Sequence, residues 1–232
     1  MASRVVIKIG GSLFFDDAGV NTDRVQKFAQ FLKKTPEIQA IIVGGGRIAR
    51  TYIQGARALG ASETECDLLG IATSRINGQL LIRAIGDTTY PWVPKSVEEF
   101  AKARATGKLV VMGGLQPGQS TTSVAVIIAE FLHADLLVVL TDVDGIYDKD
   151  PHKFPDAKRF SSITVDQLQK VLQKGAGAKI AAAGEYQIFD PVSSEIVKRS
   201  QLSVHLLSGK ELAQISHIIK DPAADIGTKI TR

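Results

Sequence analysis

Three apolar, strand-like runs in this chain each end in consecutive glycines. They are residues 5–9 before Gly10-Gly11, residues 40–43 before Gly44-Gly45-Gly46, and residues 109–112 before Gly113-Gly114. Because the runs are continuously apolar rather than alternating, they predict parallel strands buried on both faces. Ligands of such sheets bind beyond the carboxyl ends of the strands, where glycine lets the backbone approach closely. The three glycine runs therefore predict one shared binding region.

Stretches with helical spacing separate these runs and indicate an α/β fold with right-handed crossovers. The helix predicted over residues 63–85 has a capping box, with Ser62 before it and Glu65 at the third position. Another fully apolar strand is predicted at 136–140. The other helices predicted in this half are residues 23–34, 48–59 and 118–134.

The residue composition of the chain changes after residue 140. A turn-rich loop is predicted at 141–155, and the small residues of 175–184 predict a mobile loop. Beyond them we expect helices at 167–172, 191–199 and 211–219, a strand at 202–207 and an edge strand at 226–232. We therefore expect one domain over residues 1–232 with two lobes, about 1–135 and 136–232.

Composition limits the classes of partner. The 232 residues include 28 Lys plus Arg against 24 Asp plus Glu, a net charge of +4 that is not concentrated in one segment. This small excess suits a small anionic substrate and does not argue for nucleic acid. The single cysteine, Cys66, excludes a disulfide within the chain and a cysteine zinc site. With no apolar run long enough for a membrane span and no signal-peptide pattern, we expect a cytoplasmic protein.

Charged and hydroxyl side chains lie beside the glycine runs. Lys8 interrupts the first strand, where it either extends from an edge position or points into the site. Arg47 and Arg50 fall in a first helical turn, where a cation needs an anionic partner unless it is simply solvated. Ser120, Thr121 and Thr122 are three consecutive hydroxyl side chains, which is more than a helix cap requires. A glycine run that is followed by the N-terminus of a helix forms an anion site, most often for phosphate.

Several motifs together resemble the amino acid kinase superfamily. They are residues 7–12, 43–50 and 141–151; residues 67–71, 74–77 and 113–121 are similar to the archaeal type of uridylate kinase within it. The resemblance covers essentially the whole chain. It implies a three-layer α/β/α sandwich with a mainly parallel central sheet and the reaction ATP + UMP → ADP + UDP in pyrimidine nucleotide biosynthesis. It also implies magnesium held mainly by the ATP phosphates, without protein metal ligands, and a homohexamer built as a trimer of dimers.

The same resemblance implies roles for individual residues. Lys8 and Arg50 would be catalytic. The ATP site would comprise Lys8, Gly10, Gly11, Ser12, Thr141, Asp142, Tyr147 and Asp150. The UMP site would comprise Gly45, Gly46, Arg50, Asp67, Gly114, Leu115, Gln116, Pro117, Gly118, Gln119, Ser120 and Thr121.

One position departs from the family pattern. Many uridylate kinases carry an aspartate after the hydroxyl pair, and this chain has Thr122 there. Asp190 is a candidate replacement, and Lys179 is a candidate for the second lysine of acetylglutamate kinases. Two other functions stay open: another kinase of the superfamily, acting on isopentenyl phosphate or acetylglutamate, or a non-catalytic storage protein on the same fold.

Overall fold

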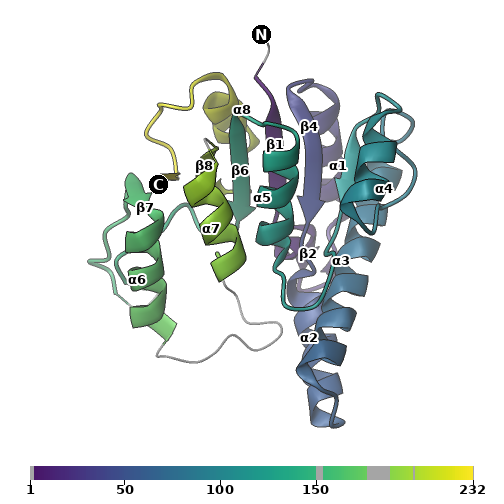
Figure 1. Ribbon diagram of the computed structural model, residues 1–232, viewed down its shortest axis with the longest axis horizontal. Coiled ribbons are helices and arrows are strands. Elements are labelled where there is room, and N and C mark those ends of the chain that lie inside the picture. Colours follow the sequence, from purple (N-terminus) through teal and green to yellow (C-terminus); the bar gives the residue numbers. More distant parts are fainter. Residues whose placement is uncertain (1–2, 150–153, 177–188, 201, 232) are drawn as a thin grey trace.

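The computed structural model describes residues 3–149, 154–176, 189–200 and 202–231 (Figure 1). Its centre is a seven-stranded sheet in the order β5-β4-β1-β6-β8-β9-β7. β5, β4, β1, β6 and β8 run parallel, β9 is antiparallel to β8, and β7 is parallel to β9. The strands are β1 (Val5–Ile9), β4 (Ile38–Val43), β5 (Val110–Met112), β6 (Leu136–Thr141), β7 (Ser162–Thr164), β8 (Ser203–Ser208) and β9 (Thr228–Thr231).

The strand order reverses around β1. From β1 the chain adds β4 and β5 on one side of the sheet, then returns to add β6 and β8 on the other. A reversal of this kind opens a crevice at the carboxyl ends of the strands, which is where α/β proteins bind ligands. All three predicted glycine runs follow strands of this parallel group, so they meet at the same end of the sheet.

Helices cover both faces of the sheet. Side chains of α4 (Val97–Arg104), α5 (Thr121–Phe131), α6 (Val165–Ala176) and α7 (Pro191–Arg199) join one core. Those of α1 (Thr22–Lys33), α3 (Glu63–Ile85) and α8 (Leu212–Lys220) join the other. The three-layer α/β/α sandwich with a mainly parallel sheet is thereby confirmed.

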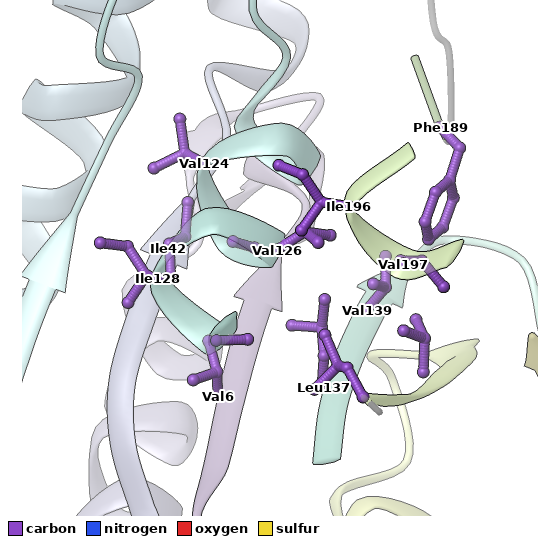
Figure 2. Close-up of a cluster of buried hydrophobic side chains, with 14 of the residues drawn as sticks. Val6, Ile42, Val124, Val126, Ile128, Leu137, Val139, Phe189, Ile196 and Val197 are labelled. Atoms are coloured by element: carbon purple, nitrogen blue, oxygen red, sulfur yellow. The ribbon is translucent and has the colours of Figure 1, made fainter. Parts of the chain in front are cut away.

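The core between the sheet and α5 and α7 is made of branched aliphatic side chains. Figure 2 shows Val126 of α5 and Val197 of α7 facing Val139 of β6 and Val6 of β1. All four are essentially inaccessible to solvent. Burial of this apolar area stabilises the fold at roughly 25 cal/mol per Å². It also holds the starts of α5 and α7 close to the carboxyl end of the sheet.

The helix α3 has the predicted limits and the predicted capping box. Its first half packs on α2 (Gly46–Ala58), and this pair extends beyond the end of the sheet in Figure 1. Ala49, Ile53 and the free thiol of Cys66 form a small core between the two helices. Two loops of the candidate site rest on this pair.

Some predicted elements differ from the structure. The helix predicted from residue 118 begins at Thr121, because the Ser120 side chain accepts a hydrogen bond from the Ser123 N–H and caps it. The last strand is not an edge strand, since β9 lies between β8 and β7. α6 is longer than predicted, while α4, β7 and a small hairpin, β2 (Phe15–Asp16) with β3 (Gly19–Val20), were not predicted.

The predicted loop 175–184 begins within α6, and its remainder lies outside the described residues. Among the helices of the described ranges, none has the length and apolar character needed to cross a membrane.

Candidate active site

A cavity of about 410 Å³ opens at the carboxyl ends of β1, β4 and β6. It receives side chains and backbone from the glycine runs, from α2 and α3, and from the start of α5. The predicted site residues that line it are Lys8, Gly10, Gly11, Ser12, Gly45, Gly46, Arg50, Asp67, Gly114, Gln119, Ser120, Thr121, Thr141 and Asp142. The tertiary structure thus brings together segments that are more than a hundred residues apart in the chain.

Lys8 lies on the central strand rather than at an edge. β1 pairs with β4 on one side and β6 on the other, so the side chain leaves the sheet at its carboxyl end, where it lines the cavity. Only 6% of Lys8 is exposed. Burial lowers the pKa of Lys8 to about 8, and the charge of Asp142 partly offsets this. Lys8 is therefore a cation near neutral pH at the end of the sheet where the glycine runs meet.

Two glycine runs pack directly against each other. A Cβ on Gly11 would lie 2.2 Å from the carbonyl oxygen of Gly44, and one on Gly46 would lie 2.4 Å from the carbonyl carbon of Gly11. Gly46 also has a φ of +66°, which side chains rarely adopt. Only glycine allows the first strand and the start of α2 to approach so closely.

The start of α2 presents backbone N–H groups to the cavity. Its first turn lacks a side-chain cap, because Gly45 occupies the capping position. Arg50, one turn into the helix, lines the cavity and donates from Nη2 to the Ser12 hydroxyl at 3.3 Å. Within the described part of the chain, Arg50 forms no ion pair. Free N–H groups and an arginine together form an anion-binding end of the cavity.

Arg47, unlike Arg50, does not line the cavity. Its guanidinium forms an ion pair with Asp17 at 3.0 Å and donates to the carbonyl oxygen of Asp16. Both partners belong to the β2–β3 hairpin region, and Arg47 is exposed outside the cavity. Of the alternatives left open for Arg47, the structure shows an anionic partner within the protein, the carboxylate of Asp17.

The start of α5 supplies hydroxyl groups to the cavity. Ser120, Thr121 and Thr122 line it. Asp190, before α7, accepts hydrogen bonds from the Ser120 N–H at 3.0 Å and the Ser123 hydroxyl at 2.5 Å, and caps α7 through the Ser193 N–H.

The bonds to Asp190 also bear on its ionisation. Burial alone would raise the pKa of Asp190, but these hydrogen bonds bring it below its ordinary value. Since Asp190 does not line the cavity, it is not the acid that faces Lys8; in the described residues Asp142 has that position.

One anchoring residue was not predicted as part of the site. The side-chain amide of Asn77 on α3 donates to the carbonyl oxygens of Gly44 at 2.9 Å and Gly45 at 3.2 Å. It holds the second glycine run from behind. The available sequence signal was the motif at residues 74–77, which contains Asn77; its burial is known only from the structure.

The remaining predicted residues lie at the margin or beyond it. Leu115 packs against the core, while Gln116, Pro117 and Gly118 form an exposed turn in which the Gly118 N–H donates to Asp67 at 2.8 Å. Tyr147 bonds to Asp144 at 2.9 Å and does not line the cavity. Asp150 and Lys179 lie outside the described residues. The described residues contain no group of three or more His, Cys, Asp or Glu arranged to hold a metal ion.

Comparison with known proteins identifies the family. Residues 3–208 match the amino acid kinase family. The chain belongs to this family. A uridylate kinase of Sulfolobus acidocaldarius is 38% identical over 217 residues, which cover 94% of each chain. One of Methanocaldococcus jannaschii is 40% identical over 92% of this chain and 95% of that protein.

Solved structures agree with this family. The crystal structure of uridylate kinase from Archaeoglobus fulgidus superimposes with a TM-score of 0.81 at 32% identity, over 98% of this chain and 100% of that one. The UMP kinase of Bacillus anthracis has a TM-score of 0.79 at 21% identity, which shows the shared fold. In this amino acid kinase the cavity at the end of the sheet is the candidate active site.

Proposed function

We propose that this amino acid kinase is a UMP kinase, which transfers the γ-phosphoryl group of ATP to UMP. The observation that carries the proposal is near full-length similarity to several archaeal proteins named uridylate kinase. The cavity supports it independently, because two separate segments that favour anions open into one space. Two bound nucleotides that exchange a phosphoryl group require such an arrangement.

At the acceptor side, Arg50 and the N–H groups near Gly45 and Gly46 would hold the UMP phosphate. Arg50 can donate two parallel hydrogen bonds to phosphate oxygens. Asp67, which also lines the cavity, would accept the ribose hydroxyls. The loop from Gly114 to Thr121 would surround the remaining part of the nucleotide, with the carbonyl and amide groups of Gln116 and Gln119 available to the base.

At the donor side, Gly10, Gly11 and Ser12 would hold the ATP phosphates, with Lys8 at the transferred group. Thr141 and Asp142 line the same end, and Tyr147 and Asp150 complete the assignment as predictions. Magnesium on the ATP phosphates would neutralise part of their charge. Asp142 lines the cavity together with Lys8, and its negative charge favours the protonated form of Lys8.

The transfer itself needs alignment more than proton exchange. An oxygen of the UMP phosphate attacks the γ-phosphorus while the bond to the β–γ bridging oxygen breaks and ADP leaves. That oxygen is already ionised near neutral pH, so no general base is required. Lys8 stabilises the charge on the transferred group and on the leaving oxygen.

A substrate panel tests this function. The purified protein is assayed for ADP release with ATP and Mg²⁺ and, separately, UMP, CMP, dUMP, AMP, isopentenyl phosphate and acetylglutamate. We expect the fastest turnover with UMP. Turnover of isopentenyl phosphate or acetylglutamate alone would identify a different kinase of the family, and binding of nucleotide without any turnover would identify a storage protein.

Two further properties belong to the proposal. We infer that the chain assembles as a homohexamer built as a trimer of dimers, which its exposed apolar side chains on α3 support. We also infer a cytoplasmic location, where both nucleotide substrates are available. We infer an acceptor lobe, about 1–135, and an ATP lobe, about 136–232, with Gly10, Gly11 and Ser12 of the first lobe reaching the ATP phosphates.

A further inference from the structure

The loop that follows β5 is attached to α3 by two consecutive side chains. Arg75 donates from Nε to the carbonyl oxygen of Gly114 at 3.0 Å and from Nη2 to that of Leu115 at 3.1 Å. Ser74 accepts the Gly114 N–H at 2.7 Å and donates its own hydroxyl proton to the carbonyl oxygen of Ile71. Both polar groups of the Gly114 backbone are therefore bonded to α3 side chains.

There is no free space between this loop and the helix. A Cβ on Gly113 would lie 2.7 Å from the Ser74 hydroxyl and 2.8 Å from the Arg75 backbone nitrogen, and one on Gly114 would lie 3.0 Å from Ile71. The loop therefore rests on the helix with backbone on backbone. A side chain at Gly113 or Gly114 would therefore displace the loop from the helix.

Arg75 acts on the cavity without entering it. Gly114 lines the cavity, and so do Ser120 and Thr121 farther along the same loop, whereas Arg75 does not. The half-buried guanidinium instead lines an outer groove that also contains Glu99 and Trp92. It therefore contacts the loop from outside the cavity.

The geometry of the two bonds restricts the backbone. In an extended strand, successive carbonyl groups point to opposite sides, so one side chain cannot reach both. A guanidinium that binds the carbonyls of Gly114 and Leu115 together selects a bent conformation at the end of β5. A lysine ammonium is a point charge without the planar set of donors, so it holds two carbonyls less well.

We propose that Arg75 is a positioning residue for the acceptor nucleotide. By fixing the backbone at Gly114 and Leu115, it sets where the following loop lies against UMP. This inference rests on the proposed function, and it predicts an effect on UMP binding that is separate from ATP binding.

The test compares Arg75→Met and Arg75→Lys with Arg83→Met, an exposed arginine two turns along the same helix. We expect Arg75→Met to raise the KM for UMP about tenfold, with kcat and the KM for ATP within about twofold. Arg75→Lys should give an intermediate KM, about threefold raised, and Arg83→Met should match the wild type. Thermal melting adds a readout that does not depend on turnover: the shift produced by UMP should shrink in Arg75→Met while the shift produced by ATP remains.

The outcomes separate the two proposals. If the KM values for UMP and ATP rise together, or if only the melting temperature falls, Arg75 has a general structural role and the inference is wrong. An unchanged Arg75→Met enzyme also overturns it while UMP kinase activity stands. A wild type without UMP-dependent turnover overturns the proposed function and this inference with it.

Discussion

The proposed role of Lys8 in phosphoryl transfer is accompanied by a cost to the stability of the fold. Its pKa falls from 10.5 to about 8 on folding, because burial disfavours the charge more than Asp142 favours it. The wild type therefore carries a penalty that is complete below pH 8 and disappears as the pH rises to 10.5, where the unfolded side chain also loses its proton. Residues at functional sites often destabilise the fold in this way.

We expect Lys8→Met to stabilise the ligand-free protein at pH 7, by about 3 kcal/mol, while lowering kcat at least about 100-fold. Urea unfolding at pH 7 and near pH 10.5 measures the first effect, which should shrink at the higher pH. The exposed Lys33→Met serves as control, with no comparable change. A less stable Lys8→Met at pH 7 would show that the amine is held by contacts that outweigh its burial.

The same pKa predicts a pH dependence of the reaction. At ATP concentrations below its KM, kcat/KM for UMP reports groups of the ligand-free enzyme, so it should fall as the pH rises through about 8. The cause is loss of the Lys8 charge that neutralises the phosphates. Initial rates between pH 6 and 10 measure this limb; a profile that stays flat to pH 10 would contradict the role given to Lys8.

Arg50 and Arg47 form a natural pair for comparison, because they lie three residues apart on α2 but only Arg50 lines the cavity. Arg50→Ala should weaken UMP binding by about 2 kcal/mol, roughly 30-fold, through loss of charged hydrogen bonds. Arg47→Ala should stay within about twofold. Calorimetric titration with UMP measures both, and equal losses would mean that the two arginines contribute only long-range charge.

At the scale of elements, the site depends on backbones that touch. The glycine runs after β1 and β4 meet with no room for a side chain, and Asn77 and Arg75 of α3 hold the loops from behind. One helix thus anchors loops from two different strands. The geometry of the cavity therefore depends on the position of α3 as much as on the residues that line it.

Two glycines of α2 test this contact. Gly46→Ala places a Cβ 2.4 Å from the Gly11 backbone at a positive φ, so we expect a loss of about 2 kcal/mol or more in unfolding free energy. Gly55→Ala, in open space on the exposed side of the same helix, should stabilise by about 0.5–1 kcal/mol. Urea denaturation measures both. If Gly46→Ala were neutral, the two runs would not be in direct contact.

At the scale of the whole molecule, α3 has two parts to play: its side chains anchor the loops of the candidate site, and it carries an exposed apolar surface. Leu68, Ala72 and Ile76 repeat every four residues along α3 and therefore share one face. Leu68 is 52% exposed and Ile76 is 68% exposed in the single chain. Large exposed apolar side chains grouped in this way are typical of an interface.

We expect the native mass to be six times that of one chain, measured by light scattering after size exclusion. The double variant Leu68→Glu with Ile76→Glu should lower that mass, because charges on this face oppose its burial. Val20→Glu, on the exposed β2–β3 hairpin, should leave it unchanged. A wild type that is a monomer would overturn the assembly.

The sequence by itself determined the longer strands, most helices and the end of the sheet where the cavity opens. Continuous apolar runs, the capping box of α3 and the proline at the start of α7 are local signals, and each of these elements formed where they indicated. The glycine runs identified the binding end because parallel strands must share it. Short elements such as β7 and the hairpin carry too few residues for a periodic pattern, so they were missed.

Only the tertiary structure decided which charged groups face the cavity. Arg47 and Arg50 lie in the same part of α2, yet Arg47 pairs with Asp17 of the hairpin region while Arg50 lines the cavity. Asp190 was a candidate acid and instead caps α7, while Asp142 faces Lys8. The anchoring contacts of Asn77 and Arg75 join segments some 30 to 40 residues apart. Local pattern determines an element, but the environment of a side chain depends on how distant elements pack.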